Sequence, residues 1–150
     1  MSTPNFYAAV YAIIRNQEGK ILFSRRKNTG FMDDKYQLPA GHMDGNESMA
    51  IAMIRELKEE INIDVEEKDM NIVHISHRIS LGWREYFDVY FEILDFVGTP
   101  IINEPEKCSA LNYFDIQNIN KNDFVLYDID IIKITDKGTH FSSVDINDYK

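Results

Sequence analysis

The sequence predicts an α+β fold in a single domain that spans residues 1–150. A length of 150 residues suits one domain with its own core. Several short apolar segments read as strands, whereas one segment carries an apolar stripe at helical spacing. No repeat, low-complexity run or Pro/Gly-rich linker marks a domain boundary.

The composition excludes several classes of protein. The 16 basic and 25 acidic residues give a net charge of -9, which argues against general nucleic-acid binding through a basic surface. Cys108 is the single cysteine, so an internal disulfide is excluded and a reducing compartment is favoured. The longest early apolar stretch, 8–14, is far too short to span a membrane and lacks a charged leader. We therefore expect a cytoplasmic protein without a membrane partner.

The charge divides along the chain. Residues 1–40 carry six basic and three acidic residues, a net of +3, and residues 41–150 carry a net of -12. An anion site beside a metal site would give this division, and so would two solvated faces.

The first forty residues are predicted to be mainly extended. Residues 6–14 are rich in apolar and aromatic side chains, as a buried strand is, and Pro39 disfavours helix before it. We expect the first two strands to pair as a hairpin. The predicted order is strand 6–14, turn 16–19, strand 20–26, loop 28–35 and a short extended segment 36–40.

The segment 47–61 is the clearest helix. Its apolar stripe recurs at spacings of four, three and four, at Ala50, Ile54, Leu57 and Ile61. Asn46 is the predicted N-cap, and Asn62 is predicted to take the left-handed conformation that ends many helices.

Three more strands and a second helix are predicted after this helix. The alternation of Phe87, Val89, Phe91 and Ile93 with polar residues is typical of a strand. The segment 123–135 suits a strand or a buried helix, and we favour the helix. The strands are expected at 72–80, 84–96 and 111–114, and the tail from about residue 137 is expected to fray.

Three carboxylates share a second face of the first helix. Glu56, Glu59 and Glu60 lie at positions i, i+3 and i+4, where like charges repel each other. Solvent and neighbouring cations such as Lys58 would offset this repulsion, and so would a divalent cation. Oxygen ligands of this kind suit Mg²⁺ or Mn²⁺.

Two neighbours favour the cation. The loop before the helix contains Gly41, whose backbone carbonyl is close enough in sequence to reach the metal. Arg55 lies eight residues after Glu47 and four before Glu59, so it can bridge carboxylates that do not bind metal. The alternative for Arg55 is an ordinary surface ion pair.

This pattern resembles the Nudix box of the Nudix (MutT-like) hydrolase family. The family has Gly where this chain has Asn62, and segments 21–26, 38–42 and 104–114 add to a likeness that covers about residues 6 to 120. The matching residues read Gly41, five residues, Glu47, seven residues, Arg55-Glu56-Leu57, one residue, Glu59-Glu60, one residue, Asn62-Ile63.

The resemblance implies the Nudix fold, an α/β/α sandwich with a mixed β-sheet between helices. It implies a metal-dependent pyrophosphohydrolase that cleaves the diphosphate of a nucleoside triphosphate or related compound by water attack on phosphorus. A nucleotide-sugar or ADP-ribose hydrolase and a non-catalytic nucleotide-sensing module are the alternatives. The implied partner is a small nucleotide, and the oligomeric state, a homodimer included, stays open.

The resemblance also implies roles for individual residues. Glu56, Glu59, Glu60 and the main chain at Gly41 would bind the metal, Mg²⁺ or Mn²⁺. One of these Glu residues, or hydroxide on the metal, would activate the water, and Arg55 would position Glu47. Glu106 is the candidate for a further metal-binding carboxylate, with Glu104 second.

Three side chains outside the box are candidates for substrate binding. Arg26 ends a strand and can fork onto a phosphate, and His77 and Arg78 lie on a later strand where they can line the pocket. The alternative for each is a solvated or half-exposed strand residue.

Overall fold

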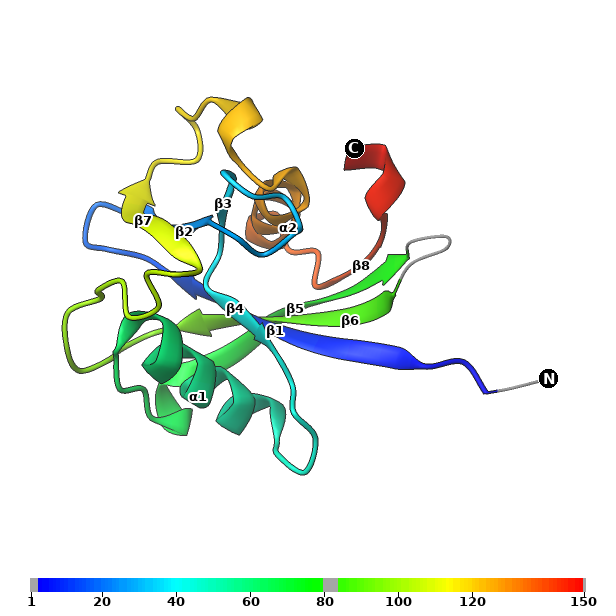
Figure 1. Cartoon of the computed structure of the whole chain (residues 1–150), viewed down its shortest axis with the longest axis horizontal. Helices are drawn as coiled ribbons and strands as arrows, with labels where there is room; N and C mark the ends of the chain where they lie inside the picture. The colour runs from blue at the N-terminus through cyan, green and yellow to red at the C-terminus, as the bar shows by residue number, and fades with distance from the viewer. Residues whose placement is uncertain (1–2, 80–83, 150) are drawn as a thin grey trace.

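The computed structural model describes residues 3–79 and 84–149, which form eight strands, two α-helices and three short 3₁₀ helices (Figure 1). The strands are β1 (Phe6–Ile14), β2 (Ile21–Arg26), β3 (Tyr36–Gln37), β4 (Ala40–His42), β5 (Met70–Ile79), β6 (Glu85–Ile93), β7 (Cys108–Phe114) and β8 (Phe141–Asp145). The helices are α1 (Met49–Ile61) and α2 (Leu126–Asp136), and the 3₁₀ helices are η1 (Glu67–Asp69), η2 (Lys121–Asp123) and η3 (Ile146–Tyr149).

The strands form two sheets. The larger sheet has the order β4-β1-β6-β5-β8, in which β1 runs parallel to β6 and β5 runs parallel to β8. The smaller sheet has the order β3-β2-β7 and is antiparallel. Strand β1 is an interior strand of the larger sheet, and its last six residues are all buried because both of its faces are covered.

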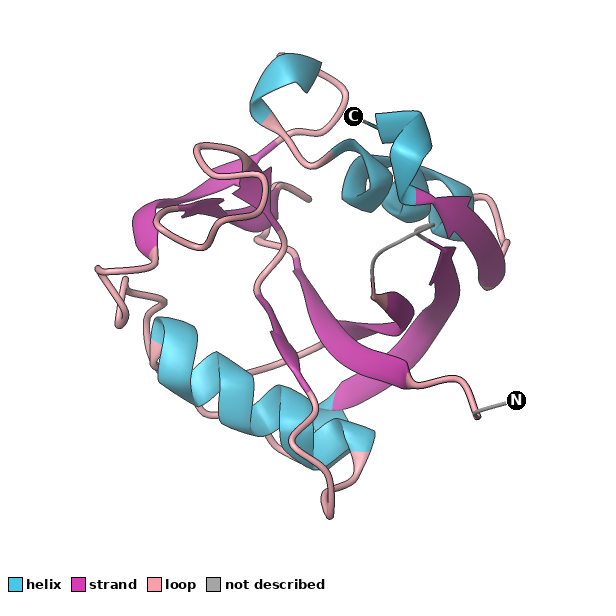
Figure 2. Ribbon diagram, turned by 45° about the vertical axis from the view of Figure 1, so that its right-hand side comes forward, coloured by secondary structure: helices cyan, strands magenta, loops and turns pink. Residues whose placement is uncertain are grey.

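The larger sheet lies between the two helices, as Figure 2 shows. Along β1, Val10 and Ala12 pack in one core with Leu57 of α1, whereas Tyr11 packs in a second core with Ile132 of α2. This alternation follows from the two-residue period of a strand. The predicted α+β sandwich with a mixed sheet between helices is confirmed.

The predicted hairpin between the first two strands is wrong. Strands β1 and β2 share only the isolated bridge between Arg15 and Ile21. The turn forms, because the side chain of Asn16 accepts hydrogen bonds from the backbone N–H groups of Glu18 and Lys20. However, both edges of β1 are already occupied by β4 and β6, so β2 leaves to join the smaller sheet.

Helix α1 begins two residues later than predicted. Its N-cap is Ser48, whose Oγ accepts a hydrogen bond from the backbone N–H of Ile51 at 3.1 Å, whereas Asn46 lies in the preceding turn with a φ of 56°. The C-terminal prediction is confirmed, because Asn62 is left-handed with φ 57° and ψ 43°. Its backbone N–H donates to the carbonyl of Lys58.

The C-terminal tail does not fray over its described length. Strand β8 pairs with the edge of β5, and Ile146 is buried in a third small core with Val125 and Tyr127. The predicted second helix is confirmed as α2, and the strand predictions are close to the observed bounds, although Ser80 lies outside the described residues. No helix in the described part of the chain is long and apolar enough to cross a membrane. The cytoplasmic location and the open homodimer stay predictions.

Candidate active site

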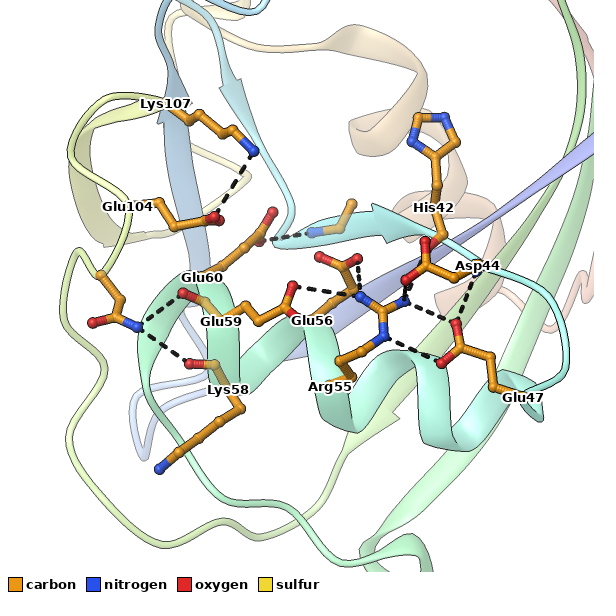
Figure 3. Close-up of polar contacts among 12 residues, drawn as sticks. His42, Asp44, Glu47, Arg55, Glu56, Lys58, Glu59, Glu60, Glu104 and Lys107 are labelled. Atoms are coloured by element: carbon orange, nitrogen blue, oxygen red, sulfur yellow. Dashed lines mark hydrogen bonds and ion pairs between the residues drawn. The ribbon is translucent and has the colours of Figure 1, made fainter.

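The three carboxylates of the first helix share one pocket. Glu56, Glu59 and Glu60 project from α1 toward the loop that carries Glu104, as Figure 3 shows. The pocket has a volume of about 770 Å³. Its wall also includes Gly41 of β4, so β4, α1 and the loop before β7 meet here.

Gly41 is needed because of its close approach to Glu56. A Cβ atom at position 41 would lie 1.9 Å from Cδ of Glu56, which is far inside any real contact. The missing side chain therefore lets the Glu56 carboxyl group lie directly against the backbone of β4. This contact places the main chain of Gly41 beside the carboxylates.

Arg55 fixes the orientation of several carboxylates at once (Figure 3). Its Nε and Nη2 donate to the two oxygens of Glu47 at 3.1 and 2.8 Å, and its Nη1 donates to Glu56 at 2.8 Å. Nη1 also donates to Glu59 at 3.4 Å, and Nη2 donates to the backbone carbonyl of His42 at 3.1 Å. Glu47 further accepts the backbone N–H of Asp44 at 2.9 Å. The network joins the helix to the loop before it.

The carboxylates of Glu56, Glu60 and Glu104 repel one another electrostatically. Burial raises the pKa of Glu60 well above its ordinary value, and the charges of Glu56 and Glu104 raise it further. Burial also raises the pKa of Glu56, although the hydrogen bond from Arg55 opposes this. The backbone N–H of Ala40 donates to Glu60 at 3.2 Å and offsets part of the cost. The cluster thus holds more negative charge than its own donors stabilise.

The donor set fits a hard divalent cation. Among residues 3–79 and 84–149 no three His, Cys, Asp or Glu side chains converge closely enough to coordinate one ion. Glu56 accepts a hydrogen bond from Arg55, and Glu60 accepts one from the backbone N–H of Ala40. The chemistry of the site nevertheless favours a cation, since the pKa values of Glu56 and Glu60 are raised and Mg²⁺ prefers carboxylate and carbonyl oxygens.

The structure brings Glu104 into the pocket instead of Glu106. Glu104 lines the pocket wall and raises the pKa of both Glu56 and Glu60, whereas Glu106 is not among the lining residues. Lys107 lines the same wall, and its Nζ lies 3.8 Å from Oε2 of Glu104. The sequence suggested both acids, and only the path of the loop distinguishes them.

Two of the three predicted substrate-binding residues reach the pocket. Arg26 and Arg78 line its wall. His77 does not line it, because successive residues of β5 point to opposite faces of the sheet. His77 instead lies 2.6 Å from Glu85 and stacks on Phe87 at 4.9 Å.

The sequence analysis missed a buried polar group behind this wall. Asp88 of β6 pairs with Arg78, and Asp128 of α2 accepts hydrogen bonds from Tyr90 Oη and the backbone N–H of Leu38. The predicted alternation along residues 84–96 counted Asp88 only as one of its polar residues. Tyr86, Asp88 and Tyr90 are nevertheless buried, and the two tyrosines pack in the core that contains Ile132 of α2. The occurrence of Arg78 and Asp88 on consecutive predicted strands was the sequence signal for this ion pair.

Comparison with known proteins gives matches in sequence and in structure. The family model described as NUDIX domain matches residues 5–133. The RNA pyrophosphohydrolase of Ectopseudomonas mendocina (strain ymp) is 33% identical over 86 residues, which are 57% of this chain and 48% of that protein. The match therefore spans about half the length of this curated relative.

Two solved structures show the same fold. The MutT NUDIX hydrolase from Burkholderia pseudomallei superposes with a TM-score of 0.77 at 21% identity, covering 91% of this chain and all of that one. The MutT protein from Methanosarcina mazei Go1 superposes with a TM-score of 0.74 at 21% identity, covering 88% of this chain and 94% of that one.

Proposed function

The chain belongs to the NUDIX family, and from this premise we propose that it is a metal-dependent pyrophosphohydrolase of nucleoside triphosphates or related nucleoside-diphosphate compounds. The observation that carries the proposal is the shared pocket of Glu56, Glu59, Glu60 and Glu104 beside Gly41. Because a pyrophosphate is itself an anion, a bare carboxylate cluster would repel it, and only the cation-loaded site attracts it.

The residues that would hold Mg²⁺ or Mn²⁺ are the three helix carboxylates, the main chain of Gly41, and Glu104 in place of Glu106. A bound divalent cation would cancel charge on the diphosphate oxygens and polarise the phosphorus–oxygen bond that breaks. Arg55 donates to Glu56 and also to Glu47, so it restricts the direction of the Glu56 carboxylate that would bind the cation.

Side chains of the pocket would accept the proton of the attacking water and bind the phosphate oxygens. The oxygen of an attacking water bonds to phosphorus, its proton passes to a carboxylate of the cluster, and the anhydride bond to the leaving phosphate breaks. Lys107 and Arg26 lie in the wall and supply positive charge for the phosphate oxygens. Arg26 is held in place by hydrogen bonds to Gln37, Thr29 and the Phe31 carbonyl.

The experiment that tests this function is a substrate screen with product identification. Nucleoside triphosphates, dinucleotides and nucleotide sugars would be incubated with Mg²⁺ or Mn²⁺, and the products separated by anion-exchange chromatography. We expect a nucleoside monophosphate and pyrophosphate from a triphosphate, and no turnover after chelation with EDTA. If the protein binds a nucleotide tightly but hydrolyses none of the tested compounds, the result would contradict the proposal and indicate a sensing module.

The assignment of Glu104 has its own matched control. Glu104→Gln removes a charge from the pocket wall, whereas Glu106→Gln removes one from the same loop outside the wall. We expect the first variant to need more Mg²⁺ for half-maximal activity, by about tenfold or more, and the second to behave as the wild type. The reverse result would return the role to Glu106.

A further inference from the structure

We propose that the part of the pocket wall formed by Arg78, Tyr86 and Tyr127 is a nucleobase subsite that prefers bases with two adjacent hydrogen-bond acceptors. Guanine and cytosine have such an edge, whereas adenine and uracil do not. This inference rests on the proposed function in one respect, namely that the pocket binds a nucleotide. Hydrolysis itself is not required for it.

Arg78 presents a preorganised pair of donors. Its Nε and Nη2 donate to the two oxygens of Asp88 at 2.7 and 3.2 Å, which fixes the guanidinium group from one edge. The described residues provide no hydrogen-bond acceptor for Nη1, and Nη2 uses one of its two hydrogens on Asp88. The parallel N–H bonds of Nη1 and Nη2 are therefore available at the second edge of a side chain that lines the pocket.

Aromatic rings direct the ligand to that edge. The guanidinium carbon of Arg78 lies 4.1 Å from the ring centroid of Tyr86 and 5.4 Å from that of Tyr127. The Tyr86 hydroxyl lies 2.8 Å from Nε2 of His42, which holds the ring in place. With its flat face packed against rings, the guanidinium group can reach a ligand mainly through acceptors that lie in its plane.

The charge of the Arg78–Asp88 pair favours a neutral ligand over a phosphate. Asp88 is only 1% exposed and forms a bidentate ion pair with Arg78, whose side chain is 10% exposed. The pair has no net charge, so its free donors attract a phosphate less strongly than an unpaired arginine would. A planar base edge matches both the donor pair and the surrounding rings.

Tyr127 adds a second polar group to the subsite. Its hydroxyl is buried, and it has no hydrogen-bond partner among the described residues. A buried hydroxyl without a hydrogen-bond partner destabilises the protein, and a ligand that hydrogen-bonds to it would remove this cost. A hydroxyl can donate a hydrogen bond as well as accept one. Tyr127 also lines the pocket, and the proposed partner of its hydroxyl is a bound base.

The donor pair distinguishes the four bases by simple complementarity. Guanine presents N7 and O6 as adjacent acceptors, and an arginine fork onto these atoms is the commonest specific base contact. Cytosine presents O2 and N3 in the same way. Adenine places its N6 amino donors beside N7 and N1, and each carbonyl of uracil flanks the N3–H donor, so one N–H of Arg78 would face a donor in either case.

The test is calorimetric titration of the Mg²⁺-loaded protein with GMP, CMP, AMP and UMP, which share one phosphate and differ only in the base. We expect GMP and CMP to bind on the order of tenfold more tightly than AMP and UMP. Arg78→Lys keeps a cation beside Asp88 but loses the fork, so it should bring the four affinities within about threefold of one another.

A second variant keeps the test independent of the buried ion pair. Tyr127→Phe removes only the unpartnered hydroxyl, so the melting temperature should not fall, and GMP or CMP should bind about threefold or more weakly. Tyr113→Phe, which removes a hydroxyl outside the pocket, is the matched control and should leave all four affinities unchanged.

Equal affinity of the wild type for the four nucleotides, no binding of any of them, or a preference that survives Arg78→Lys would overturn the inference. Turnover of triphosphates without a base preference would overturn it while leaving the proposed hydrolase intact. An Arg78-dependent preference in a protein that hydrolyses nothing would support the subsite and contradict the hydrolase.

Discussion

Arg55 donates two hydrogen bonds to Glu47, which lies eight residues earlier in the chain, from Nε at 3.1 Å and from Nη2 at 2.8 Å. The hydrogen bonds from Arg55 lower the pKa of Glu47 and keep it charged. Because the third nitrogen of the same guanidinium group donates to Glu56, one side chain sets the distance between an acid that stays out of the pocket and one that lines it.

Replacing Arg55 by Lys should lower activity without unfolding the protein. An ammonium group keeps the charge but cannot hold Glu47 and Glu56 in fixed directions together. We expect kcat at saturating Mg²⁺ to fall by about tenfold or more, as for other residues that orient metal ligands.

The matched control is Lys58→Ala on the same helix. Lys58 pairs with Asp64 at 3.2 Å, and it does not line the pocket. Its loss should leave kcat nearly unchanged. An Arg55→Lys enzyme as active as the Lys58→Ala enzyme would mean that Glu56 is oriented by other contacts.

Gly41→Ala should destabilise the protein and impair the site. The new Cβ would lie 1.9 Å from Cδ of Glu56, so either the carboxyl group or β4 must move, at a cost of about 1–3 kcal/mol. Urea denaturation measures this cost. In a Glu56→Ala background the same substitution should cost much less, because the colliding group is gone. Equal costs in the two backgrounds would disprove the clash.

Asn62 is the one departure from the family motif, and its conformation predicts how substitutions behave. Its φ of 57° lies in the left-handed region, which costs other L-residues about 1–2 kcal/mol. Asn62→Ala should therefore lower the free energy of unfolding by about that amount, whereas Asn62→Gly should change it by less than about 0.5 kcal/mol. If the alanine variant is as stable as the glycine variant, the helix ends in another way.

Asp128 should make stability depend on pH between about 4 and 7. Burial raises the pKa of Asp128 from its ordinary value of 3.8 to about 7. The folded state therefore holds a proton that the unfolded chain releases. The contribution of Asp128 to stability is fully present below about pH 4, is lost as the pH rises toward 7, and stays constant above that.

Denaturation of the wild type and of Asp128→Asn across this range tests the sign. The wild type should lose stability relative to the variant as the pH rises, by an amount on the order of a few kcal/mol. Asp130→Asn, an exposed position on the same helix, should show no such trend. A difference that grows in favour of the wild type with rising pH would contradict the assignment.

The sequence was enough to predict the helix of the site and its charged face. Periodicity located α1, the i, i+3, i+4 spacing grouped Glu56, Glu59 and Glu60, and the preference of Asn for the left-handed region identified the helix end. These features depend on local backbone geometry, which the sequence records directly.

Features that depend on tertiary pairing were not predictable in the same way. The turn after β1 suggested a hairpin, but strand partners are chosen by which edges other segments already occupy. The pairing of β8 with β5, and the entry of Glu104 but not Glu106 into the pocket, depend on segments far apart in the chain. His77 and Arg78 were both predicted to line the pocket, although neighbouring residues of a strand face opposite sides of the sheet.

The most direct test of the central claim is steady-state hydrolysis by Glu60→Gln, measured with Mg²⁺ on the best triphosphate from the screen. Glutamine keeps the size of the side chain and can still accept the backbone N–H of Ala40, so the melting temperature should be preserved. With one charge gone from the cluster, we predict that Mg²⁺-dependent release of pyrophosphate is lost. A folded Glu60→Gln enzyme that keeps full activity would contradict the account.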